Sequence, residues 1–182
     1  MQIIVRVKWT PEDHLLAQKQ CTMPRPNRCP NCSAAKSLVA LGYYERWLSG
    51  TNGKHLRVSV RRFRCRACGR TVSLLPDFAQ PYRLVRNEAI ERYFSAPSER
   101  IEVRRNSTLL RCYWRRFTLW LPELKRAIGT GLGRSPPASE PRSWWVFLMD
   151  ATGDLARATR RLVEHMRVTI FGRYRCHQPR PS

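Results

Sequence analysis

Two cysteine pairs in this sequence have the spacing of a metal site. The first is Cys29-Pro-Asn-Cys32 and the second is Cys65-Arg-Ala-Cys68. Each Cys-x-x-Cys segment can close a tight turn, and two such turns together place four thiolates at tetrahedral positions, which suits Zn²⁺. Gly69 follows the second pair, where a left-handed backbone is often needed and glycine adopts it at the least cost. The spacing therefore predicts one zinc ion, bound by Cys29, Cys32, Cys65 and Cys68.

Two other uses of paired cysteines fit the sequence less well. A redox-active dithiol usually needs one Cys-x-x-Cys segment in a βαβ setting, and the sequence shows no such setting. Structural disulfides belong to secreted proteins, and nothing in the sequence indicates secretion. Because four thiolates complete the coordination shell of zinc, we expect the metal to be structural and not catalytic.

The segment between the cysteine pairs predicts β structure. Residues 37–48 and 56–63 are rich in aromatic and β-branched side chains, and a turn cluster at 49–53 lies between them, which is typical of a β-hairpin. Residues 71–75 predict a third strand. Each Cys-x-x-Cys turn is a zinc knuckle, and the order knuckle, hairpin, knuckle and strand is that of a zinc ribbon. We therefore assign residues 27–76 to a small three-stranded antiparallel ribbon.

The charge of the chain indicates a polyanionic partner. The 182 residues include 34 Lys and Arg against 13 Asp and Glu, a net charge of +21. Nucleic acid is the usual partner of so basic a chain, and an anionic membrane surface is the alternative. Most of the cations are arginine, which pairs bidentately with phosphate and with guanine. We therefore expect a nucleic-acid-binding protein.

The apolar segments of the sequence indicate the cellular compartment of the protein. The longest apolar run, residues 144–149, is far too short to span a membrane, so no membrane partner is expected. Residues 1–9 are too short for a signal peptide and are interrupted by Arg6 and Lys8. We expect a cytoplasmic, nucleoid-associated protein.

Arginines are dense around the second cysteine pair. Five of them fall within residues 61–70, on a strand and a knuckle that the metal would hold in place. A solvated charged face is the plainer explanation, but their rigid display favours a phosphate-binding surface. The predicted contacts of the ribbon are Arg61, Arg62, Arg64, Arg66 and Arg70.

Residues 82–128 predict a helix-turn-helix domain. A first helix covers about 85–94, a short second helix 99–104, and a third helix begins at Ser107, a good N-cap. In the third helix Leu110, Trp114, Phe117 and Leu121 form one apolar stripe, and arginines occupy the opposite face, which is the design of a recognition helix. An ordinary basic amphipathic helix is the alternative. The predicted nucleic-acid contacts are Arg104, Arg105, Ser107, Thr108, Arg111, Arg115 and Arg116.

The remaining segments have weaker patterns. Residues 1–26 predict a strand and a short helix, with Thr10 as its cap. Glycine, proline and serine at 129–143 predict a flexible linker, 144–171 a C-terminal helical segment broken near Gly153, and 172–182 a basic tail. The helical segment could dock on the body of the protein, form a homodimer or contact nucleic acid. The expected class is α+β, a zinc ribbon followed by a helical domain and a C-terminal helical segment.

Three segments carry a resemblance to a known family. They are Cys-Pro-Asn-Cys at 29–32, Ser-Leu-Val-Ala-Leu-Gly-Tyr-Tyr-Glu-Arg at 37–46, and Arg-Arg-Phe-Arg-Cys-Arg-Ala-Cys-Gly-Arg-Thr-Val-Ser-Leu-Leu-Pro at 61–76. The chain resembles the N-terminal module of bacterial insertion-sequence transposases and short bacterial proteins built in the same way. In these proteins a helix-turn-helix follows, with a pattern similar to residues 107–117. The resemblance covers about residues 27–120 and implies binding to double-stranded DNA, usually at the ends of a mobile element.

The sequence departs from full transposases in its acidic residues. The resemblance implies that full enzymes continue into a ribonuclease-H-like domain with three metal-binding acids. Here Asp150 ends an apolar run, but only Asp154 and Glu164 follow it, so we interpret Asp150 and Asp154 as surface or helix-capping acids. No catalytic residue is assigned, and we expect the chain not to be an enzyme.

Our prediction is therefore a DNA-binding zinc-ribbon and helix-turn-helix protein, either linked to a mobile element or acting as a regulator. Two alternatives stay open. One is an RNA-binding or ribosome-associated zinc ribbon. The other is a non-catalytic subunit or fragment of a transposase, which would work with a transposase or recombinase partner.

Overall fold

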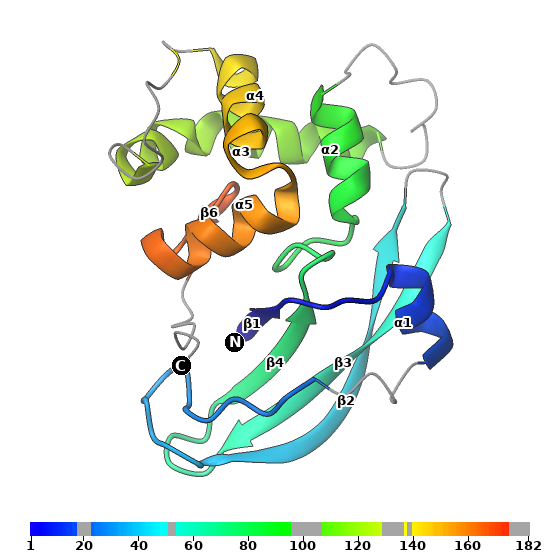
Figure 1. Cartoon of the computed structure of the whole chain (residues 1–182), viewed down its shortest axis with the longest axis vertical. Helices are drawn as coiled ribbons and strands as arrows, with labels where there is room; N and C mark the ends of the chain where they lie inside the picture. Colours follow the sequence, from blue (N-terminus) through cyan, green and yellow to red (C-terminus); the bar gives the residue numbers. More distant parts are fainter. Residues whose placement is uncertain (18–22, 51–53, 96–106, 129–136, 138–139, 175–182) are drawn as a thin grey trace. The chain divides into compact units, whose positions relative to one another are not determined.

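The chain folds into two compact units of mixed α and β structure (Figure 1). The computed structural model describes residues 1–17, 23–50, 54–95, 107–128, 137 and 140–174. Of these, the first unit takes those within 1–48 and 55–84, and the second takes those within 49–54 and 85–174. None of the described helices is long and apolar enough to cross a membrane.

The first unit is built on a four-stranded sheet. Its strands are β1 (Gln2–Val5), β2 (Leu38–Ser49), β3 (His55–Cys65) and β4 (Thr71–Pro76), in the order β1-β4-β3-β2. Strands β2 and β3 run in opposite directions in Figure 1, and β3 pairs antiparallel with β4. The three strands expected for the ribbon are therefore present, each within two residues of its predicted ends.

The fourth strand corrects the prediction of a three-stranded antiparallel ribbon. Strand β1 pairs parallel with β4, with Ile3 beside Leu74 and Ile4 beside Leu75. The terminal ammonium group of Met1 adds a hydrogen bond of 2.8 Å to the carbonyl oxygen of Thr71. Because Ile3 and Ile4 are both buried, β1 contributes apolar area to both faces of the sheet.

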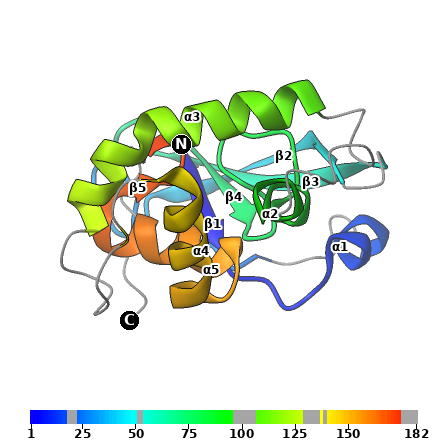
Figure 2. The same cartoon turned by 90° about the horizontal axis from the view of Figure 1, so that it is seen from above.

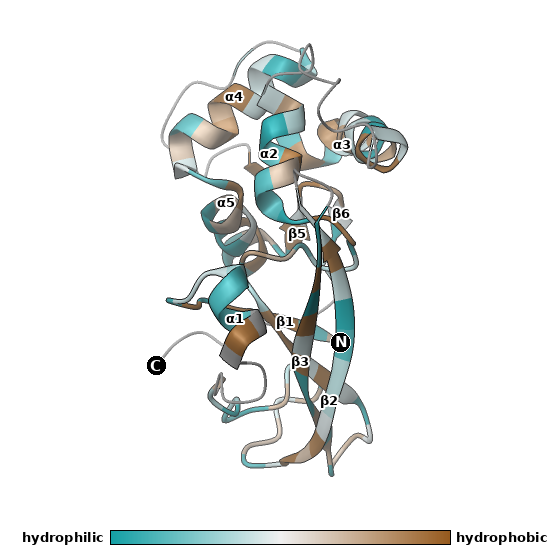
Figure 3. Ribbon diagram, turned by 90° about the vertical axis from the view of Figure 1, so that its right-hand side faces the viewer, coloured by the Kyte–Doolittle hydropathy of each residue, from teal (hydrophilic) through white to brown (hydrophobic). Residues whose placement is uncertain are grey.

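The sheet buries a different face at each end. Near the hairpin, Leu56, Val58 and Val60 of β3 enter one apolar cluster, whereas Phe63 and Cys65 enter another nearer the knuckles. Since side chains of a strand alternate between faces, the change from even to odd numbers means that the two clusters lie on opposite faces. Hydrophilic and hydrophobic residues accordingly alternate along β3 (Figure 3).

Helix α1 (Pro11–Ala17) begins with the expected cap. The Thr10 hydroxyl accepts a hydrogen bond from the Asp13 N–H at 3.1 Å, and the Asp13 carboxylate accepts one from the Thr10 N–H at 3.0 Å. His14 is buried, with its Nδ1 accepting from Trp9 Nε1 at 3.0 Å and its Nε2 lying 3.1 Å from the Ser59 carbonyl oxygen. Residues 18–22, which follow this helix in the sequence, lie outside the described part of the chain.

The second unit is mainly helical. It contains α2 (Asn87–Ser95), α3 (Ser107–Ile128), α4 (Pro141–Thr152), α5 (Leu155–Arg161), the π-helix η4 (Leu162–Met166), and a hairpin of β5 (Val168–Thr169) and β6 (Gly172–Arg173). Helix α3 extends along one side of this unit, with α4 and α5 beside it (Figure 2). All of these elements except β6 contribute buried residues to one apolar core.

Aromatic rings occupy the centre of that core. The Phe94 ring lies edge-on to Trp114 and Trp145, with ring centroids 4.8 and 4.9 Å apart. Trp145 also donates from Nε1 to the Ser95 hydroxyl at 3.0 Å. Of the three roles left open for the C-terminal segment, the structure shows that it docks on the helices that precede it.

Two boundaries in the second unit differ from the sequence prediction, and one agrees with it. Helix α4 begins at Pro141, inside the predicted linker 129–143, most of which lies outside the described residues. Helix α4 ends at Thr152, next to the break expected near Gly153, and the φ of Gly153 is +88°. The predicted helix up to residue 171 gives way instead to the β5–β6 hairpin.

That hairpin also shortens the predicted basic tail. Arg167 adopts the left-handed conformation, with φ of +55°, and so ends η4 and turns the chain. Gly172 and Arg173 are paired in β6, and the Tyr174 side chain is buried. Of the predicted tail, residues 175–182 lie outside the described part of the chain.

Candidate metal centre and basic surfaces

The four predicted cysteines come together in the first unit. Their Sγ atoms all lie within 4.8 Å of one another, with Cys29 Sγ 3.8 Å from Cys68 Sγ and Cys32 Sγ 3.7 Å from Cys65 Sγ. A tetrahedron of sulfurs about 2.3 Å from a central ion has edges of about 3.8 Å. The arrangement therefore fits a metal ion held by four thiolates, two from each Cys-x-x-Cys segment.

Two matching turns position these cysteines. In the first, Ser33 donates its N–H to the Cys29 carbonyl oxygen at 2.9 Å, and Cys29 donates to the Ala34 carbonyl oxygen at 3.0 Å. In the second, Gly69 donates to the Cys65 carbonyl oxygen and Cys65 donates to that of Arg70, both at 2.9 Å. The two turns therefore share one hydrogen-bond pattern.

The fourth residue after each leading cysteine has a left-handed backbone. The φ of Gly69 is +70°, as its position in the sequence predicts, and the φ of Ser33 is +59°. Both turns therefore need this conformation, although only the second has a glycine to provide it.

Ser37 is a functional neighbour that the sequence analysis did not identify. Its Oγ lies 3.2 Å from Cys65 Sγ and 2.9 Å from the Ala34 carbonyl oxygen, and its own carbonyl oxygen accepts from the Arg66 N–H at 2.8 Å. Ser37 thus joins the two turns. No motif marks it, because it lies five residues after the first pair and becomes adjacent to Cys65 only when the hairpin folds.

The electrostatics of the cluster favour a bound cation. The Ser37 hydroxyl is the main cause that lowers the pKa of Cys65, to about 6. The Ala34 backbone also lowers the pKa of Cys32, but desolvation and the three neighbouring thiols outweigh it and raise that pKa to about 11. Four thiolates this close repel one another without a cation, so the donor set suits a metal that binds soft sulfur ligands.

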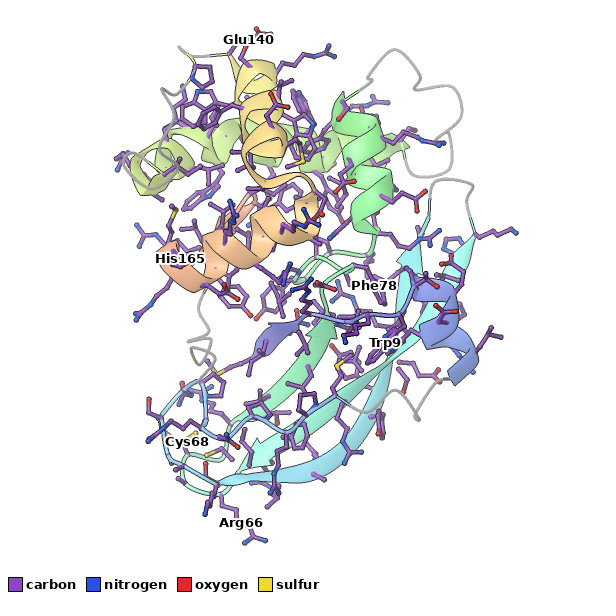
Figure 4. The ribbon with its side chains drawn as sticks, viewed as in Figure 1. Trp9, Arg66, Cys68, Phe78, Glu140 and His165 are labelled. Carbon is purple, nitrogen blue, oxygen red and sulfur yellow. The ribbon has the colours of Figure 1, made fainter. Side chains whose placement is uncertain are left out.

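The arginines around the second turn divide into two groups. Arg64, Arg66 and Arg70 are exposed, and within the described residues their side chains make no hydrogen bond, ion pair or ring contact. Figure 4 shows Arg66 extending away from the ribbon near Cys68. These three remain free to contact a ligand.

Arg61 and Arg62 are half-buried and stack on aromatic rings. The Arg61 guanidinium lies 4.5 Å from the ring centroid of Tyr43 and 5.4 Å from that of Phe63. The Arg62 guanidinium lies 5.7 Å from the ring centroid of Tyr44. Because neighbouring residues of a strand point to opposite faces, these two arginines serve opposite faces of the sheet.

Helix α3 presents its predicted polar residues to solvent. It begins at Ser107, and Thr108, Arg111 and Arg115 are exposed, while the predicted stripe is buried except for the half-buried Trp114. Arg116 is exposed. It also supports the fold, because its Nε donates a hydrogen bond of 2.9 Å to the Phe171 carbonyl oxygen. The predicted second helix, 99–104, and the predicted contacts Arg104 and Arg105 lie outside the described residues.

Asp150 and Asp154 lie where surface and helix-capping acids are expected. Asp150 is exposed on α4. Asp154 caps α5, where its Oδ1 accepts a hydrogen bond of 2.7 Å from the Arg157 N–H. The Glu91 carboxylate supports the same helix start by accepting from the Leu155 N–H at 2.6 Å, and burial raises the pKa of Glu91.

Comparison with known proteins supplies one match. A family model described as a domain of unknown function, DUF6431, matches residues 29–112. The match begins at the first cysteine of the candidate site and includes β2, β3, β4, α2 and the start of α3. No curated protein and no solved structure matches the chain.

Proposed function

We propose that this chain is a zinc-ribbon protein that binds double-stranded DNA. In this proposal Cys29, Cys32, Cys65 and Cys68 hold one structural Zn²⁺. The four-sulfur geometry and the matched turns support zinc, since thiolates at tetrahedral positions are its usual structural ligands. When bound, the ion would fix the second turn and the arginines on it.

The observation that carries the proposal is a set of exposed arginines whose side chains make no contact with the other described residues. In the first unit they include Arg64, Arg66 and Arg70, on the strand end and turn that the cysteines hold. Cations that neutralise no internal acid raise the electrostatic free energy of the isolated protein, and phosphates would offset it. A rigid turn also loses little conformational entropy when its arginines bind.

Helix α3 is the proposed sequence reader. Its exposed Arg111 and Arg115 are four residues apart, so they lie on one face of the helix, opposite the aromatic core. Arginine in the major groove pairs bidentately with guanine. We propose that α2 and α3 belong to a helix-turn-helix, and the resemblance to insertion-sequence transposases suggests sites at the ends of a mobile element.

Selection from a random duplex library at about physiological salt tests the proposal, with structured RNA as competitor. Enrichment of one motif that requires Arg111 is the expected result. Removal of zinc with a chelator should abolish binding to the enriched duplex, and added zinc should restore it. A library without enrichment, from which RNA displaces the protein, would overturn the duplex-reading proposal and favour an RNA-binding ribbon.

A further inference from the structure

A second surface of the hairpin combines aromatic rings with arginines. It consists of the outward-facing side chains of β2 and β3, namely Tyr43, Glu45, Trp47, Arg57 and Arg61, which we call the hairpin patch. Strand β2 is an edge of the sheet (Figure 3). Its inward residues Leu48 and Tyr44 pack in the core, so the alternate residues face away from it.

Trp47 is the most exposed aromatic residue of the patch. The residue is 56% exposed, whereas tryptophan is highly buried on average. It offers a large π-surface that the fold leaves open. The spacing of four residues along the strand places Trp47 about 13 Å from Tyr43, far enough for the two positions to meet different bases of one strand.

Arg61 supplies a second stacking surface. Its guanidinium carbon lies over the rings of Tyr43 and Phe63, at 4.5 and 5.4 Å from their centroids. A guanidinium held in this way can stack on a base and still donate to a phosphate, as arginine does in single-strand recognition. Phe63 is buried, so its ring fixes the arginine and stays out of contact with a ligand.

Arg57 is paired weakly. Its Nε lies 3.1 Å from Glu45 Oε2, and both side chains are about half exposed, at 52% and 54%. An exposed ion pair of this kind contributes little to stability, so a phosphate can replace the carboxylate. Glu45 is therefore the one acidic group of the patch, and its removal should favour an anionic ligand.

We propose that the hairpin patch binds a short single strand of nucleic acid, with one base stacked on Trp47, another on Arg61, and the backbone near Arg57. Exposed aromatics next to arginines suit unstacked bases, because every base has a π-face and every nucleotide a phosphate. Duplex DNA hides its base faces and fits this surface poorly. The inference goes beyond the duplex-binding proposal and does not depend on it.

The test measures binding of labelled dT12, U12 and a 12-base-pair duplex to the zinc-loaded full chain by fluorescence anisotropy. Trp47→Ala should weaken binding to the single strands by roughly 5- to 150-fold and leave duplex binding unchanged. Trp47→Phe should retain most of the affinity. Tyr82→Ala is the matched control, because Tyr82 is also an exposed aromatic residue of this unit but lies outside the patch. The dT12 and U12 arms show which sugar the site accepts.

Glu45→Gln gives a readout that misfolding cannot imitate. Loss of the carboxylate should tighten single-strand binding, by up to about fivefold. A wild-type chain that binds the duplex but neither single strand would overturn this inference and leave the duplex proposal intact. Equal losses on all three probes in Trp47→Ala, or unchanged single-strand binding in both variants, would also overturn it. Binding to single strands through Trp47 without duplex binding would support it and refute the duplex proposal.

Discussion

Replacement of Cys65 by serine should remove the metal and unfold the ribbon. Cys65 is fully buried, its Sγ lies 3.7 Å from Cys32 Sγ, and its side chain is part of the apolar cluster that includes Phe63 and Val72. Structural zinc contributes about 10–16 kcal/mol in small zinc-binding domains near pH 7. The whole stability of a domain is only about 5–15 kcal/mol, so loss of the ion exceeds what the remaining apolar contacts can supply.

The assay is zinc content per chain together with thermal unfolding followed by circular dichroism. Wild type should bind one zinc per chain, and Cys65→Ser should bind none and lose the β signal at room temperature. Cys112→Ser is the matched control, since Cys112 is exposed on α3 and lies outside the four-sulfur cluster. A Cys65→Ser protein with unchanged melting, or a wild type that stays folded without any metal, would refute the metal claim.

Three further variants test the basic surfaces and the buried histidine. Arg66→Ala should lower duplex affinity equally on all sequences and reduce the slope of log K against log salt by about 0.9. Arg126→Ala is the control and should not change the slope, because Arg126 is already paired with Glu123. An unchanged slope in Arg66→Ala would exclude a phosphate contact at Arg66. Arg111→Ala should cost about 1–3 kcal/mol on the selected site and much less on other sequences, and equal losses would make it a phosphate contact. Burial lowers the pKa of His14, so the unfolded chain binds a proton at this residue more readily than the folded chain does. The free energy of unfolding should therefore keep its full value above pH 6.5 and should decrease as the pH falls through the lowered pKa of His14. Urea titrations of wild type and His14→Gln, with zinc occupancy checked, should show this loss only in wild type; parallel curves would contradict it.

Motifs with a local cause were predictable from the sequence. The two Cys-x-x-Cys turns, the left-handed Gly69 and the Thr10 cap each depend on residues within five positions of one another. The hairpin and the buried stripe of α3 were also predictable, because periodicity records which side chains face a core. These are the features in which residue type and spacing decide the structure.

Features that depend on distant pairing were not predictable. Strand β1 pairs with β4 although about 70 residues separate Gln2 from Ser73, and no local pattern names its partner. The β5–β6 hairpin begins after Arg167, which adopts a left-handed backbone although arginine gives no sign of it in the sequence. Trp120 helps to hold that hairpin by donating to the Thr169 carbonyl oxygen at 3.1 Å, a contact that exists only in the folded unit.

The structure also distinguishes arginines that make contacts within the fold from arginines that make none with the other described residues. Arg116 is committed to the Phe171 carbonyl oxygen, and Arg61 is held by aromatic rings, so both would lose native contacts if a ligand displaced them. Arg66 and Arg111 have no such contacts among the described residues. Binding through the free arginines therefore costs only their side-chain entropy, whereas Arg61 is preorganised and suits a ligand that stacks. On this reasoning, the strong salt dependence should come from the free arginines, and the preference for unpaired bases should come from the ring-held arginine.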